Sequence, residues 1–415
     1  MPLKEKEGPA KMKRTFALAA LAVLLACGTA QAQQMDVKIG VLTDMASLYA
    51  DDTGQGSVAA ANLAAQDFMK THPKVKVEVV SADHQNKPDI GTGIAKQWID
   101  VDHVDMITGV PTSSVALAIM QVVKDKNKAL IDSGAGSSDI TGSKCNANTV
   151  HWTYDTWMLA NGTGKAIVKN GGDTWFFITA DYAFGHALER DTAAVVEKNG
   201  GKVLGKVRVP INTSDFSSFL LQAQASKAKI IGLANAGGDT INAIKQGAEF
   251  GIVAGGQKFA GLLIFAPDIK ALGLKAAQGL MFTETFYWDM NDGTRAWTKR
   301  WHAERGAANK FPTMIHAGVY AGIMHYLKAR VALGAGEHDG KSVVAKMKEM
   351  PTDDPLFGKG TIRADGRKIH PAYLFEVKKP SESKYPGDFY KTRATIPADE
   401  AFRPLNEGKC PLVKS

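Results

Sequence analysis

Three hydroxyl side chains, Thr112, Ser113 and Ser114, stand where a short apolar segment gives way to a helical pattern, in GVPTSSVALAI. A helix N-terminus has unpaired backbone N–H groups and a partial positive charge, so it favours an anion. Ser and Thr side chains add hydrogen-bond donors without bulk. We therefore expect these residues to form an uncharged site for a carboxylate. The alternative is that Ser113 or Ser114 only caps the helix.

A loop of small residues, DSGAGSSD, follows the next predicted strand and places Gly134, Ala135 and Gly136 beside it. Asp139 stands where a dinucleotide-binding fingerprint needs its third glycine, so we reject that interpretation. The chain also lacks the spacing of a P-loop, a G-x-S-x-G elbow, an H-E-x-x-H motif and a Cys–His zinc set. We expect no metal, no cofactor and no enzymatic activity. An exported enzyme acting on a small acid is the alternative from a different class.

Aromatic side chains form the second group with binding chemistry. Tyr49 follows the first predicted strand, and Tyr182 and Phe184 follow a strand of the second half of the chain, in TADYAFG. Rings that face a cleft would give a ligand apolar contact area. The alternative for each ring is ordinary packing in the core.

These residues need strand ends to position them, and the chain from Val37 onward alternates short β-rich runs with helical segments. An irregular segment, 133–161, interrupts the alternation, and we expect it to be a loop and crossover. The pattern predicts α/β architecture, with two lobes that each hold a doubly wound parallel sheet. The predicted strands cover 37–43, 75–82, 104–109 and 128–134, then 174–180, 202–210, 228–236 and 258–265.

The last third of the chain changes to two long helical patterns, 294–306 and 312–336, and ends with short strands near 360–362 and 372–379. Such a chain would return to the first lobe and finish on the second, so that several crossings form a multi-strand hinge. We expect lobe 1 over 36–155, lobe 2 over 156–283, a return to lobe 1 over 284–352, and the hinge with a return to lobe 2 over 353–415.

The N-terminus has the features of a secretory signal. Basic residues precede the apolar run 16–26, and Ala30 and Ala32 form an A-x-A cleavage site. We expect a signal peptide over 1–32, cleaved after Ala32, and a periplasmic mature protein. A lipid anchor at Cys27 is an alternative, and a start at Met12 is an alternative to the first methionine.

Charge and cysteine content limit the other roles. The formal net charge of +8 comes from 50 basic and 42 acidic residues spread along the chain, so we expect no nucleic-acid partner. Cleavage would leave Cys145 and Cys410, which suggest one disulfide in an exported protein, with two free thiols as the alternative. We expect His84, His103 and His151 to be solvated loop residues.

From Val37 to the C-terminus, the chain resembles the periplasmic solute-binding proteins of the branched-chain amino acid type of ABC importer, the leucine/isoleucine/valine-binding protein family. The resemblance lies in KIGVLTDMASLYADDTGQGSVAAANLAAQDF, ITGVPTSSVALAI, IDSGAGSSDITG, FFITADYAFGHALERD and PTMIHAGVYAGIMHYLKA, in this order. It implies a type I periplasmic binding protein, a monomer whose two lobes close on one small ligand and dock on a membrane permease. A ligand-sensing module with this fold is a further alternative.

The resemblance also implies which residues hold the ligand. The family's carboxylate and amine contacts match Thr112–Ser114 and Gly134–Gly136, an aromatic contact matches Phe184, and a residue that faces the ligand matches Asn235. The family's acidic partner of the ligand ammonium falls at or near Leu263, so this counter-ion is missing.

The absence of this acid affects which class of ligand we expect. Burying an ammonium without a partner costs several kcal/mol, so we favour an aromatic or aliphatic carboxylate without an amine. A hydrophobic or branched-chain amino acid is the alternative, with Asp51, Asp52 or Asp239 supplying the charge from another direction.

Overall fold

The computed structural model describes residues 1–3, 34–336 and 338–414. The predicted signal peptide, its cleavage site at Ala32 and the alternative lipid anchor at Cys27 lie outside the described residues. Contacts divide the chain into Met1–Gln34 and Met35–Ser415, and the following paragraphs concern the second unit. Within the described residues, no helix has the length and apolar character needed to cross a membrane.

The first sheet is parallel throughout and has the order β2-β1-β3-β4-β5. Its interior strand β1 buries Ile39 and Leu42 completely, and these side chains point to opposite faces, as expected for a strand with helices on both faces. The predicted alternation is therefore confirmed here. The strands are β1 (Met35–Thr43), β2 (Val75–Asp83), β3 (Met106–Thr108), β4 (Ala129–Asp132) and β5 (Thr149–His151), and the connecting helices are α2 (Gly54–Thr71), α3 (Pro88–Asp100) and α4 (Ser113–Asp125).

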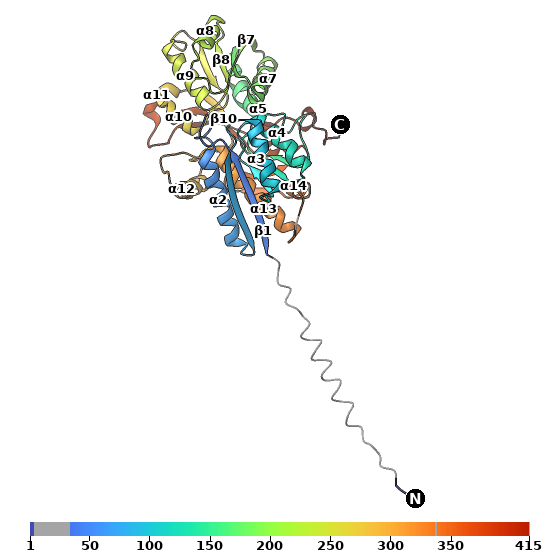
Figure 1. Cartoon of the computed structure of the whole chain (residues 1–415). Coiled ribbons are helices and arrows are strands. Elements are labelled where there is room, and N and C mark those ends of the chain that lie inside the picture. Colours follow the sequence, from blue (N-terminus) through green and yellow to red (C-terminus); the bar gives the residue numbers. More distant parts are fainter. Residues whose placement is uncertain (4–33, 337, 415) are drawn as a thin grey trace. The chain divides into compact units, whose positions relative to one another are not determined.

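The second sheet repeats this architecture, with parallel strands in the order β7-β6-β8-β9. In Figure 1, β7, β8 and α7 to α9 gather at one end of the described body, and β1, α2, α13 and α14 gather at the other. The strands are β6 (Thr174–Ala180), β7 (Lys202–Val209), β8 (Ile230–Ala234) and β9 (Lys258–Gly261), and the helices are α7 (Ala183–Lys198), α8 (Ser217–Ala225) and α9 (Gly238–Glu249).

Two sequence-based expectations about these sheets are wrong. The segment 133–161 is not only a loop, because it contains β5 and α5 (Thr156–Leu159), followed by a π-helical turn, Ala160–Gly164, and α6 (Lys165–Lys169). The strand predicted over 258–265 ends at Gly261, and residues 262–265 form a buried loop into α10 (Ala266–Leu272). A short apolar run indicates burial, and periodicity alone does not distinguish a strand from other buried backbone.

The long C-terminal helices α12 and α13 pack against helix α2 of the first sheet. Trp301 of α12 donates its indole N–H to the Gly56 carbonyl of α2 at 2.9 Å. Helix α13 is apolar around its whole circumference and is buried along most of its length. The α-helices that follow α10 are the short α11 (Leu274–Ala277), then α12 (Asp292–Arg305), α13 (Met314–Leu333) and α14 (Gly340–Glu349), and finally the short α15 (Ala398–Ala401).

Two small antiparallel sheets complete the chain. One joins β10 (Met281–Glu284), which directly follows the second lobe, to β14 (Ala372–Val377) and β15 (Tyr390–Ile396). The other contains β11 (Thr352–Asp354), β12 (Gly358–Ile362) and β13 (Lys368–Ile369). The sequence indicated β12 and β14 and missed β10, β11, β13 and β15. The predicted boundaries at 155, 283 and 352 stay predictions.

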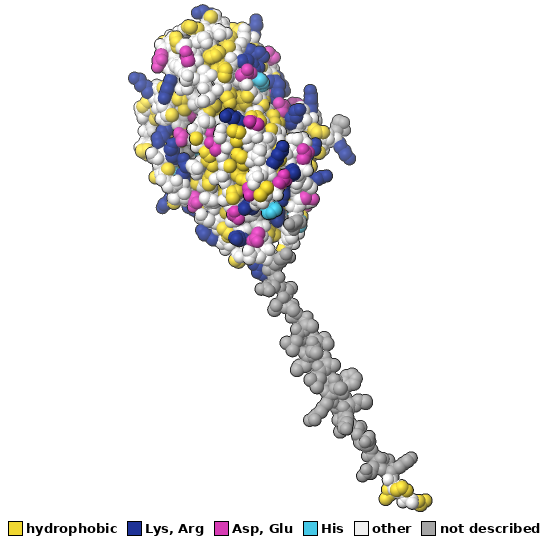
Figure 2. All heavy atoms as spheres, in the orientation of Figure 1, with side chains coloured by type: hydrophobic (Ala, Val, Ile, Leu, Met, Phe, Trp, Pro, Cys, Tyr) yellow, Lys and Arg dark blue, Asp and Glu magenta, His cyan; other side chains and the backbone are white. Residues whose placement is uncertain are grey.

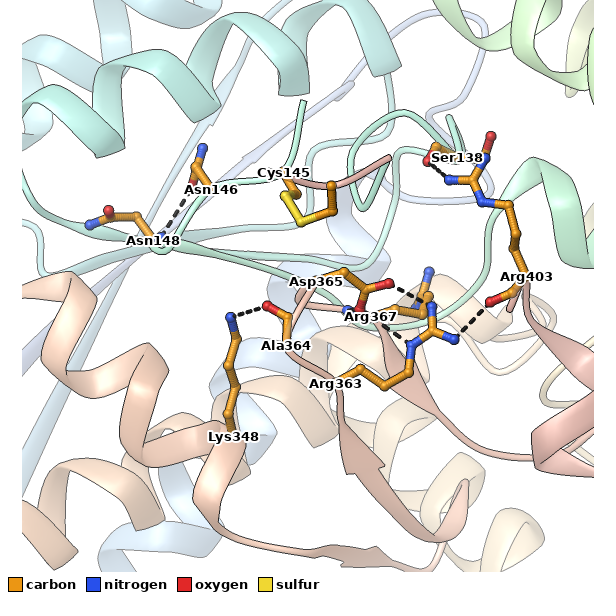
Figure 3. The surroundings of a disulfide bond; sticks show 11 residues. Ser138, Cys145, Asn146, Asn148, Lys348, Arg363, Ala364, Asp365, Arg367 and Arg403 are labelled. Atoms are coloured by element: carbon orange, nitrogen blue, oxygen red, sulfur yellow. Dashed lines mark hydrogen bonds and ion pairs between the residues drawn. A yellow bond between two sulfur atoms is a disulfide. The ribbon is translucent and has the colours of Figure 1, made fainter. Parts of the chain in front are cut away.

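A disulfide joins Cys145 to Cys410 with a Cα–Cα distance of 5.6 Å across 265 residues of sequence, which confirms the predicted pair (Figure 3). Polar contacts hold the same C-terminal segment. Arg403 donates to the Ser138 carbonyl at 2.9 Å, and Arg363 donates to the Arg403 carbonyl at 2.7 Å. The C-terminus is thus tied to the loop that leaves the first sheet.

Replacing Cys145 and Cys410 together by Ser is expected to lower the free energy of unfolding by ~2–5 kcal/mol, because the bridge restricts the unfolded chain over a long loop. Urea unfolding followed by circular dichroism measures the change. Reductant should destabilise the wild type and leave the double variant unchanged. Equal stability of the two proteins without reductant would contradict the expectation.

Candidate functional site

A small cavity of about 20 Å³ lies where loops from the two parallel sheets meet. The loops after β1, β3 and β4 reach it from the first sheet, and the loops after β6, β8 and β9 reach it from the second. Ligands of parallel α/β sheets bind beyond the carboxyl ends of the strands, which is where this cavity lies. It is lined by Tyr49, Asp52, Thr53, Pro111, Gly134, Tyr154, Tyr182, Phe184, Ala236, Leu263, Phe265 and Ile315.

Aromatic rings dominate the lining. The hydroxyl groups of Tyr49 and Tyr182 form a hydrogen bond of 2.6 Å that links the loop after β1 to the loop after β6. Tyr154 donates to the Gly134 carbonyl at 2.6 Å, and the Tyr182 and Phe184 ring centroids are 6.0 Å apart. These bonds satisfy the hydroxyl groups of the three tyrosines in the lining.

The loop after β4 is held by Asp132. One carboxylate oxygen accepts from the Gly134 N–H at 3.0 Å and from the Ala135 N–H at 3.3 Å, and the other has no hydrogen-bond partner in the described part of the chain. Burial raises the pKa of Asp132 to about 7, against the stabilising backbone bonds. The two N–H groups expected to contact a ligand carboxylate are therefore already bonded.

The predicted hydroxyl cluster lies beside the cavity, and none of its three members is among the lining residues. Thr112 donates its hydroxyl to the Asn86 side chain, and Ser113 accepts from the Ser137 N–H at 3.1 Å. Ser114 is half-buried. The N-cap of α4 is Thr112, without a side-chain cap bond, so the alternative that Ser113 or Ser114 serves only as the cap is wrong. The carboxylate site stays a prediction.

The other predicted ligand residues lie in different surroundings. Asp51 is exposed and forms an ion pair with Lys310 at 2.5 Å. Asn235 is buried and accepts from the Thr240 hydroxyl at 2.7 Å. Gly136 lies directly against the pocket rings, since a Cβ there would come within 2.8 Å of Tyr154. Of the predicted set, the structure brings Tyr49, Gly134, Tyr182, Phe184 and Leu263 to the lining.

Buried histidines correct another expectation. His84 and His151 are fully buried, whereas only His103 is exposed as predicted. His151 forms a 2.6 Å hydrogen bond with the Ala135 carbonyl, so it helps to fix the loop after β4. Burial lowers the pKa of His84 to about 4. The sequence gives no periodic signal for such contacts, because they depend on neighbouring strands.

Sequence reasoning missed several lining residues, among them Phe265, Pro111 and Ile315, and treated Asp52 only as an alternative. Asp52 is 3% exposed, and its Oδ1 atom has no hydrogen-bond partner in the described part of the chain. Burial, with the charges of Asp268, Asp51 and Glu284, raises the pKa of Asp52 well above its ordinary value. The sequence signal that could have identified Asp52 was its position in the loop after the first strand, where ligands of parallel sheets bind.

The profile of the family described as "Periplasmic binding protein" matches residues 36–384. This chain belongs to that family. A periplasmic binding protein from Burkholderia mallei is 50% identical, with a TM-score of 0.87 over 91% of this chain and 99% of that one. A branched chain amino acid ABC transporter periplasmic ligand-binding protein from Burkholderia xenovorans is 39% identical, with a TM-score of 0.79 over the same shares. The Leu/Ile/Val-binding protein homolog 6 of Brucella melitensis is 26% identical over 90% of this chain and 95% of its own length.

These similarities fit the parallel sheets and confirm the predicted type of fold and family. The relatives are binding proteins by name, and the cavity of this member of the family lies where loops of both sheets meet.

Asp132→Asn is expected to flatten the pH dependence of stability. The folded protein raises the pKa of Asp132 from 3.8 to about 7, so its protonated form stabilises the fold fully below pH ~4, and this contribution disappears as the pH rises through ~7. The wild type should lose on the order of 2–4 kcal/mol more than the variant between these values. Urea unfolding at a series of pH values measures this difference, and parallel curves for the two proteins would contradict it.

Proposed function

We propose that this chain is the periplasmic substrate-binding component of an ABC importer and that it holds one small organic ligand in the cavity between the two sheets. The main support for this proposal is the set of residues that line the cavity, because loops at the strand ends of both parallel sheets contribute to it. Family membership and the 39% identical ABC transporter relative support the role. A membrane permease is the partner that this role requires.

Closure of the two lobes is the proposed mechanism. The cavity of about 20 Å³ is the size of roughly one water molecule, so the rings must separate to admit any organic solute. The Tyr49–Tyr182 hydrogen bond joins loops of the two sheets and would break when they part. A ligand that contacts both sheets would shift the equilibrium towards the closed form that the permease recognises.

Two ligand classes follow from the sequence, an amine-free carboxylate and a hydrophobic amino acid. Neighbours from Rhodopseudomonas palustris were solved with benzoate and with 4-hydroxybenzoate, but at 20% and 22% identity they share the fold alone. The Brucella relative carries the name of the Leu/Ile/Val group. Both classes fit an apolar, ring-lined cavity.

Export completes the proposal. We propose that residues 1–32 are a signal peptide removed after Ala32, that the mature protein acts as a monomer in the periplasm, and that it binds its ligand without chemical conversion.

The surface charge is mixed. Figure 2 shows basic and acidic side chains interspersed on the face drawn, without a large patch of one sign.

The first experiment is a thermal-shift screen of the mature protein against amino acids, amine-free acids and organic amines, because a ligand of the folded state raises the melting temperature. For a compound found in this way, Phe184→Ala is expected to weaken binding at least tenfold, since it removes a buried ring that lines the cavity. Calorimetry measures the affinity.

The matched control is Phe250→Ala, because Phe250 is 38% exposed after α9 and lies outside the lining. It should leave the affinity within about twofold of the wild type. No stabilising compound in any of the three classes, or a Phe184→Ala variant that binds like the wild type, would refute the proposed site.

A further inference from the structure

The acids near the cavity differ in what they already bind. Asp51 points to solvent and pairs with Lys310. Asp239 accepts backbone N–H bonds from Asn212 and Thr213 at 3.1 and 2.9 Å. Asp52 lines the cavity, is 3% exposed, and has a carboxylate oxygen without a hydrogen-bond partner among the described residues. Of these three acids, Asp52 is the one left to contact a ligand.

Asp52 comes from the first sheet and faces the second. A Cβ placed on Gly237, just before α9, would lie 3.5 Å from its Oδ2 atom. A group held by this carboxylate would therefore sit between loops of both sheets. Such a contact links binding to closure, as the proposed function requires.

The surroundings of Asp52 are acidic and buried. Asp268 at the start of α10 and Glu284 at the end of β10 are both at most 3% exposed. Asp268 accepts the Phe265 N–H at 2.9 Å, and Glu284 has an unpartnered oxygen. In the described part of the chain, no Lys, Arg or His side chain forms an ion pair with any of these three acids. Burial raises the pKa of these three carboxyl groups, and a positive charge held among them would favour their ionised form.

The residues that line the cavity suit a cationic ligand better than an anionic one. None of its residues is Lys, Arg or His. The backbone N–H groups of Gly134 and Ala135 are already donated to Asp132. Aromatic residues such as Tyr154 and Phe265 line the cavity, and the face of an aromatic ring attracts a cation electrostatically. A ligand carboxylate would meet no cationic side chain in this lining.

We propose that the ligand of this cavity carries an ammonium group and that Asp52 is its counter-ion, with the aromatic rings enclosing the rest of the molecule. This inference rests on the proposed function and specifies its substrate class. It favours a ligand with an amine, in which an acid other than the one missing at Leu263 serves as the counter-ion. Among Asp51, Asp52 and Asp239, it selects Asp52. An amine-free acid becomes the opposing outcome.

The test compares compounds with the same kind of apolar group that carry an ammonium, a carboxylate or both. L-leucine, 3-methylbutylamine and 4-methylpentanoate form one set, and L-phenylalanine, benzylamine and benzoate form another. We expect stabilisation and calorimetric binding only with members that carry an ammonium. Tighter or equal binding of 4-methylpentanoate or benzoate would overturn the inference while leaving the proposed function intact.

Asp52→Asn and Asp51→Asn are matched variants, because they remove one negative charge each from adjacent residues, one buried and one exposed. For the ammonium compound that binds wild type most tightly, Asp52→Asn should lose at least tenfold in affinity, and Asp51→Asn should change it by less than twofold. Unchanged affinity in Asp52→Asn would refute the assignment. If no compound in either set binds, the proposed function in its present form fails and the inference falls with it.

A second measurement needs no variant. Burial and the nearby acids Asp268, Asp51 and Glu284 raise the pKa of Asp52, and Lys310 lowers it only in part. Binding of a cation must therefore release the proton from this carboxyl. The affinity for benzyltrimethylammonium, whose charge does not titrate, should therefore rise with pH between 5 and 8, on the order of tenfold per pH unit at most. Affinity that is constant or falls over this range would contradict the role of Asp52.

Discussion

The carboxyl ends of parallel strands lie at one edge of a sheet, and this constraint places most of the residues that line the cavity. Loops that follow β1, β3 and β4 are far apart in sequence, yet they converge because their strands are neighbours in register. The second sheet repeats the arrangement with β6, β8 and β9. Two such edges supply one cavity, so each side of a ligand would contact a different sheet.

Burial of acidic side chains is the second consequence of this geometry. Where loops from two sheets meet, water is excluded, and burial raises the pKa of Asp132 and Asp268 to about 7 and that of Asp239 to about 6. Asp132 and Asp239 hold neighbouring loops through backbone N–H groups, which is a structural use of a carboxylate. Asp52 differs from both because its side chain is among the residues that line the cavity, and this position separates a binding acid from a scaffold acid.

Two side chains of the hydroxyl-rich loop after β3, Thr112 and Ser113, form hydrogen bonds within the first lobe. Ser113 accepts from Ser137, which fastens the loop after β3 to the loop after β4. The aromatic residues expected at the strand ends have the larger share of the lining, and Tyr49 with Tyr182 links the two sheets. An opening movement would free these rings to pack on a ligand.

The sequence by itself determined the two α/β units, the disulfide partners and the family, because periodicity, cysteine count and segment order are local or countable properties. It located Tyr49, Tyr182 and Phe184 correctly near strand ends. It did not find β5, which is only three residues long, or β10, whose partner β14 is distant in sequence. It also misjudged His84 and His151, whose burial depends on neighbouring strands. Only the tertiary structure decided which acid remains unpaired in the cavity, since that depends on every other donor within reach of it.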